Sequence, residues 1–105
     1  MPTYLVTRHK GAIDWAHRRR LVFQHLTHLA DPALIESGDW VVGPMPIGKI
    51  ANIIAAGARY AAIEMDMPES ARGPELSADD MERFGARLVE YRVERVGAVC
   101  VEVEP

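Results

Sequence analysis

The amino-acid sequence predicts a single α/β domain in which a mostly parallel sheet carries helices on both faces. Short apolar runs typical of strands alternate with segments whose apolar residues recur at helical spacing, and this alternation favours parallel pairing of the strands. Glycine and proline separate most of the segments. The chain has 105 residues, of which 49% are hydrophobic and 26% are charged, as in one ordinary globular domain.

Three strands and one helix are expected in the first half of the chain. Apolar runs predict strands at residues 3–7 and 40–42, and a further strand that begins with residues 21–23. Residues 11–20 predict a helix with an apolar stripe, and Trp15 beside that stripe is expected in the core. Gly43 and Pro44 are expected to end the third strand.

A second helix is expected to begin at Pro46, because proline suits the first helical position. Its isoleucines recur at helical spacing, and Gly57 is a plausible C-cap. Residues 60–63 predict the beginning of a fourth strand. The loop that follows, residues 67–76, is long for a compact α/β unit, as lids often are.

A third helix is expected after Ser77, which suits the N-cap and has Asp80 three residues later. Its apolar side is expected to carry Met81, Phe84, Leu88 and Tyr91. Residues 93–103 predict a last strand that is broken or turned at Gly97, with Cys100 as inert core. Helix and strand patterns both fit residues 85–97.

Charge and composition exclude several classes of function. The net charge of −3 argues against a protein that coats long nucleic acid. No apolar stretch predicts a membrane span and no signal peptide is visible, so we expect neither a membrane partner nor secretion. A single cysteine fits a reducing cytoplasm. His25 and His28 lack a matching Cys/His pair, so the sequence predicts no metal site and no cofactor.

Polar and basic residues follow the predicted strands where ligands bind in open α/β sheets. Arg8, His9, Lys10 and Gly11 follow the first strand, and Gly43 follows the third. If these strands are neighbours, their loops share one rim. Tyr60, which begins its strand, is expected at the opposite edge of the sheet.

The second predicted helix adds a candidate anion site. The first N–H groups of a helix are unpaired and its dipole is positive there, so the Pro46 end can hold a phosphate. Gly48 permits close approach, Lys49 lies in the first turn, and Asn52 could reach a base or a sugar. The alternative is that Lys49 is an ordinary solvated lysine, at a cost of a few tenths of a kcal/mol (order of magnitude).

The basic loop that follows the first strand has two possible interpretations. Arg8 and Lys10 could hold a phosphate, the amides near Gly11 could face an anion, and His9 titrates near neutral pH as a general acid or base should. The alternative reading is a loop that merely improves solubility.

Five segments, in order between about residues 3 and 93, resemble the Csx-sixteen family of small CRISPR-associated proteins from type III systems. They are Arg8-His9-x-Gly11-Ala12-Ile13-x-Trp15-Ala16, Gly38-Asp39-x-Val41-x-Gly43, Pro46 through Gly57-Ala58-Arg59-Tyr60, Arg72-Gly73-x-Glu75-Leu76-Ser77, and Gly85-Ala86-Arg87-Leu88-x-x-Tyr91. The resemblance implies a Rossmann-like, CARF-like fold and ring nuclease activity. Such enzymes cut cyclic tetra-adenylate, the second messenger that switches on the effector nucleases.

The candidate residues suit metal-independent cleavage, in which a ribose 2′-hydroxyl attacks its own 3′-phosphodiester and leaves a cyclic 2′,3′-phosphate. Arg8, Lys10, Lys49 and Arg72 can supply positive charge, and His9 can move a proton. Glu75 could hold Arg72 or a ribose hydroxyl. In a homodimer, the two copies of the loop at residues 67–76 would surround one molecule of cyclic tetra-adenylate. The alternatives are a binding module that sequesters the messenger without cutting it, and an interaction protein whose basic rim is incidental.

Overall fold

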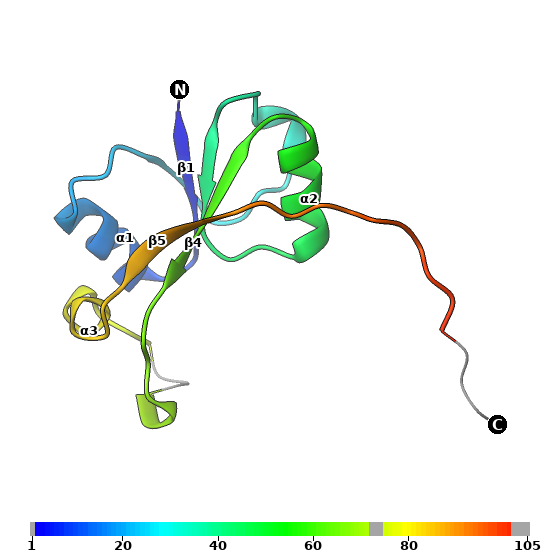
Figure 1. The fold of residues 1–105 in the computed structure, drawn as a ribbon. Helices are drawn as coiled ribbons and strands as arrows, with labels where there is room; N and C mark the ends of the chain where they lie inside the picture. The colour runs from blue at the N-terminus through cyan, green and yellow to red at the C-terminus, as the bar shows by residue number, and fades with distance from the viewer. Residues whose placement is uncertain (1, 72–74, 102–105) are drawn as a thin grey trace.

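A five-stranded sheet forms the centre of the computed structural model, which describes residues 2–71 and 75–101 (Figure 1). The strand order is β2-β1-β3-β4-β5. The strands are β1 (Thr3–Val6), β2 (Gln24–Leu26), β3 (Trp40–Val42), β4 (Arg59–Glu64) and β5 (Arg87–Tyr91). The first four are mutually parallel, and β5 pairs antiparallel with β4. The prediction of a mostly parallel α/β sheet is therefore confirmed.

Helices cover both faces of this sheet, as predicted. They are α1 (Lys10–Arg18), α2 (Ile47–Ala55) and α3 (Ala78–Arg83), with short 3-10 turns at Pro32–Leu34 and Glu69–Ala71. Figure 1 shows α1 and α3 on one side of the strands and α2 on the other. No helix in the described ranges is long and apolar enough to cross a membrane.

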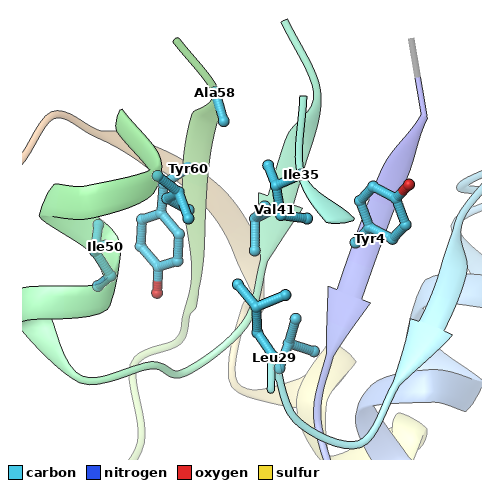
Figure 2. Packing of buried hydrophobic residues seen from close by; sticks show 9 residues of the cluster. Tyr4, Leu29, Ile35, Val41, Ile50, Ala58 and Tyr60 are labelled. Carbon is cyan, nitrogen blue, oxygen red and sulfur yellow. The ribbon is translucent and has the colours of Figure 1, made fainter. Parts of the chain in front are cut away.

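The core is divided by the sheet because alternate side chains of a strand point to opposite faces. On the α2 face, Tyr4, Val41 and Tyr60 pack with Ile50 and Ile53 (Figure 2). On the α1 and α3 face, a second cluster joins strand residues to helix residues: Leu5, Val42, Ala61, Ala12, Trp15, Ala16, Ala78 and Met81. Trp15 is 2% exposed, so its prediction as core is confirmed.

The second strand lies three residues later than predicted. Residues 21–23 are irregular, and Val22 is 92% exposed. The chain leaves α1 through Arg20, whose φ of 59° reverses its direction. Residues 19–23 are then needed to bring the chain back to the edge of the sheet, where Gln24–Leu26 pairs with β1.

The C-terminal prediction is wrong in two respects. The capping box of Ser77 and Asp80 is present, but α3 ends at Arg83 because Gly85, at φ 71°, turns the chain. Leu88 and Tyr91 therefore lie on β5 and not on a helix. The expected strand at 93–103 is irregular over its described part, 93–101, and Cys100 is exposed rather than core.

Candidate active site

The carboxyl ends of β1, β3 and β4 meet at one rim, as the sequence predicts. These strands are parallel neighbours, so the loops after Val6, Val42 and Glu64 leave the sheet at the same edge. Ligands of open α/β sheets bind at this edge. The rim is the candidate active site.

The loop after β1 is fixed by hydrogen bonds to its neighbour β2. Thr7 is buried, its N–H donates to the Leu26 carbonyl at 2.9 Å, and its carbonyl oxygen lies 2.8 Å from Nε2 of His25. The Thr7 hydroxyl accepts the backbone N–H of His9 at 3.1 Å. His9 is the N-cap of α1, so both the strand and the helix position its imidazole.

The imidazole of His9 meets a carboxylate from a distant part of the chain. Nδ1 of His9 lies 2.8 Å from Oε1 of Glu75, and both side chains are about two-thirds exposed, at 64% and 63%. A carboxylate only accepts hydrogen bonds, so this contact places the proton on Nδ1 and leaves Nε2 as the acceptor. Sequence reasoning assigned Glu75 to Arg72 or to a ribose hydroxyl and missed this partner.

All three predicted catalytic residues, Arg8, His9 and Lys49, border one hollow of about 230 Å³, which we call the basic hollow. It is lined by residues 6–9, 27–29, 44–46 and Lys49. Lys49 lies in the first turn of α2 and donates from Nζ to the Leu29 carbonyl at 3.0 Å. Positive charge from two side chains and a helix N-terminus therefore converges on a space that suits a phosphate.

A second hollow of about 360 Å³ also has His9 in its wall, and we call it the apolar hollow. Its wall is mostly aliphatic, and it consists of Thr7, His9, Ala12, Gly43, Pro44, Tyr60, Ala62, Ile63, Met65, Glu75, Leu76 and Met81. Thr7, His9 and Pro44 line both hollows. His9 therefore borders both a basic space and an apolar one.

The prediction that Tyr60 lies far from the crevice is wrong. Its backbone is near the start of β4, but its hydroxyl reaches the rim and donates to the Gly43 carbonyl. The ring lines the apolar hollow and packs beside Ile50 (Figure 2). Burial raises the pKa of the Tyr60 hydroxyl, so it stays a donor at neutral pH. In the sequence, only the length of the tyrosine side chain could have indicated that its hydroxyl contacts the rim.

Two glycines of the predicted site are explained by close packing. A Cβ at Gly43, where φ is 126°, would lie 2.0 Å from the Val6 carbonyl oxygen. A Cβ at Gly11 would lie 1.9 Å from the carbonyl oxygen of Leu76. Gly43 lines the apolar hollow, whereas Gly11 is buried under the segment that carries Glu75.

The remaining predicted ligand residues have other surroundings. Lys10 pairs with Asp14 at 3.1 Å, one turn along α1. Asn52, expected to reach a base or a sugar, lines neither hollow. Its Oδ1 accepts a hydrogen bond from Arg95 at 2.9 Å, and the same arginine approaches Gly48. Pro46 is the N-cap of α2 and lines the basic hollow. Arg72, the last predicted ligand residue, lies outside the described residues.

Among residues 2–71 and 75–101, no group of three His, Cys, Asp or Glu side chains is arranged to hold a metal ion. The histidines and charged side chains that line the two hollows are His9, His28, Glu75, Arg8 and Lys49.

Comparison with known proteins gives one match. The model of the family described as "Putative CRISPR-associated protein (Cas_VVA1548)" matches residues 4–94, which is most of the chain. The matched range includes all of β1 except Thr3, the strands β2 to β5, and every described residue of the rim. No curated protein and no solved structure matches significantly.

Proposed function

The chain belongs to the Cas_VVA1548 family of CRISPR-associated proteins, and on that premise we propose that it is a metal-independent ring nuclease that cleaves cyclic tetra-adenylate in a type III system. The observation that carries this proposal is that His9 lines both the basic and the apolar hollow. The similarity of the rim segments to the Csx-sixteen family also supports it.

The two hollows suit the two ends of a nucleotide. An adenine base fits an aliphatic space of about 360 Å³ bordered by a few polar groups, such as the Thr7 hydroxyl. Its phosphodiester fits the basic hollow, beside Arg8, Lys49 and the N-terminus of α2. The ribose between them then lies against His9, with its 2′-hydroxyl beside the phosphate.

The proposed reaction is an intramolecular displacement at phosphorus. The 2′-oxygen attacks, the P–O2′ bond forms and the P–O5′ bond breaks, which leaves a cyclic 2′,3′-phosphate and a free 5′-hydroxyl. Nε2 of His9 accepts the 2′-hydroxyl proton, and the departing 5′-oxygen takes a proton from solvent. Arg8 and Lys49 stabilise the extra charge on the phosphoryl oxygens, and Lys49 exchanges the Leu29 carbonyl for phosphate.

Glu75 completes this arrangement as a positioning residue. Its carboxylate holds Nδ1–H of His9 and thereby keeps Nε2 free to accept a proton. When His9 becomes an imidazolium, the same carboxylate stabilises the new charge.

Incubation of the purified chain with cyclic tetra-adenylate in excess chelator tests the proposal. Chromatography and mass spectrometry should show linear products that end in a cyclic 2′,3′-phosphate. An absolute requirement for added divalent ions would refute the metal-independent mechanism. Binding of the ring without cleavage would support a sequestering module instead, and the absence of binding would refute both.

A homodimer in the cytoplasm is part of the same proposal. Cyclic tetra-adenylate has its own two-fold symmetry, so two copies of the rim around one ring would match it. Arg72 is proposed to reach a phosphate from the loop that carries Glu75, and this part rests on the sequence alone.

A further inference from the structure

Beyond β5 the chain forms an extended segment that passes α2 and leaves the rest of the molecule (Figure 1). Residues 96–101, which we call the C-terminal arm, read Val-Gly-Ala-Val-Cys-Val and carry no charge. Val96, Val99 and Val101 are 99%, 85% and 77% exposed. The arm therefore places three large apolar side chains in water.

The residues just before the arm are attached to the α2 face of the sheet. Val93 packs against the core cluster of that face. Nη1 of Arg95 donates to Oδ1 of Asn52 on α2 at 2.9 Å. These contacts direct the arm along α2 and away from the opposite face of the sheet.

The composition of the arm is that of a buried strand. Disordered tails are rich in charged residues and proline, and this segment has neither. Valine favours strands, and an uncharged valine-rich window left in water invites pairing with another chain. Val99 and Val101 lie two residues apart, so in a strand they share one face. The arm therefore has the properties of a strand that lacks a partner in a single copy.

A second apolar surface without a partner lies on the opposite face of the sheet. It is a groove of about 400 Å³ between α1 and β5, and we call it the sheet groove. Its lining includes Val22, Phe23, Trp40, Val42 and Leu88. Val22 and Leu88 are 92% and 40% exposed, although both are large and apolar.

The border of the sheet groove offers what a strand needs. β5 is the last strand of the sheet, so one side of its backbone has no neighbouring strand among residues 2–71 and 75–101. Arg20 and Glu90 both line the groove, so its border carries one basic and one acidic side chain. The uncharged arm therefore meets a groove whose two charged border residues are of opposite sign.

We propose that the C-terminal arm of one copy docks in the sheet groove of a second copy, and that the exchange is reciprocal. The occupant is a second copy because the arm of the same chain starts on the other face of the sheet and is directed away from it. A two-fold exchange buries two arms and two grooves at once. This interface is distinct from the arrangement of two rims around one ring, so it is tested in the absence of cyclic tetra-adenylate.

Two charged variants and their mixture test the exchange. Val99→Lys places a charge on the arm, and Leu88→Asp places the opposite charge in the groove. Each variant alone should be a monomer of about 11.7 kDa by light scattering, whereas the parent should have twice that mass. Mixed together they should form a heterodimer, since the lysine arm meets the aspartate groove and the parental arm meets the parental groove.

Ile47→Glu is the matched control, because Ile47 is 72% exposed on α2, is not part of the arm and does not line the groove. It should leave the dimeric mass unchanged. Circular dichroism establishes that each variant is folded, and Leu88→Thr replaces Leu88→Asp if the latter is not. A monomeric parent, dimeric single variants, or a mixture that stays monomeric would each overturn the proposal.

Discussion

Nδ1 of His9 lies 2.8 Å from Oε1 of Glu75, although 66 positions of sequence separate the two residues. One belongs to the start of α1 and the other to the segment before α3, and the two helices lie on the same face of the sheet. The contact closes the apolar hollow on one side and fixes which nitrogen of the imidazole carries the proton.

Replacement of His9 by alanine should reduce turnover far more than binding. If His9 moves the proton, His9→Ala should lower kcat for cyclic tetra-adenylate by ~100-fold or more. Binding of the ring, measured by calorimetry, should change little, because the phosphate and base contacts remain. A His9→Ala variant that cleaves at the parental rate would show that His9 is neither acid nor base.

Loss of the Glu75 carboxylate should reduce turnover through His9. Glu75→Gln should lower kcat by roughly 10- to 100-fold with KM nearly unchanged, since such partners orient a group without touching substrate. In a His9→Ala background the same change should have no further effect. Glu69→Gln is the matched control, since Glu69 is exposed and lies outside both hollows. Additive losses in the double variant would mean that Glu75 acts independently of His9.

Removal of the positive charges of the basic hollow should weaken binding and turnover together. Phosphate is held in the ground state and in the transition state, so Arg8→Ala and Lys49→Ala should each lower affinity and kcat/KM by about tenfold. Arg18→Ala is the control, because Arg18 pairs with Asp79 on the outer surface of α1 and α3. An equal loss in Arg18→Ala would indicate attraction by overall charge and not by this hollow.

The hydroxyl of Tyr60 should contribute measurably to stability. Tyr60 is 4% exposed and donates to the Gly43 carbonyl, so Tyr60→Phe leaves a buried acceptor without this donor. The free energy of unfolding in urea should fall by about 1–3 kcal/mol. Tyr91→Phe, at an exposed position, should change it by less than about 0.5 kcal/mol. Equal effects of the two changes would contradict a role for the buried hydrogen bond.

Asp80 should make stability depend on pH in the acid range. Hydrogen bonds from Ser77 lower the pKa of the Asp80 carboxyl below its ordinary value of 3.8. The stabilisation is therefore present above pH 3.8 and is lost as the pH falls through the lower pKa of the folded state. Chemical unfolding below pH 4 should show a shallower loss of stability in Asp80→Asn than in the parent. Identical slopes would show that the capping box does not couple to protonation.

Local sequence patterns predict the strands β1, β3 and β4 and the rim, because each rests on one uninterrupted apolar run and the parallel-sheet rule. The C-terminal part of the sequence was less predictable, since residues 85–97 fit both the helical and the strand pattern of apolar residues. Pairing with β4 decides in favour of a strand, and that pairing is a long-range contact. The contact of His9 with Glu75 and the reach of Tyr60 to Gly43 are likewise set by tertiary structure, which no local window contains.

The strand order has a consequence for synthesis on the ribosome. β1 is the first strand to be made, yet it lies between β2 and β3 in the sheet. One edge of β1 can pair with β2 once Leu26 has been made, but the other stays unpaired until the polypeptide has been extended past Val42, and β4 can join only after that. A nascent chain arrested before β3 would therefore expose an apolar strand, which makes chaperone binding to short nascent chains the expected route to a folded product.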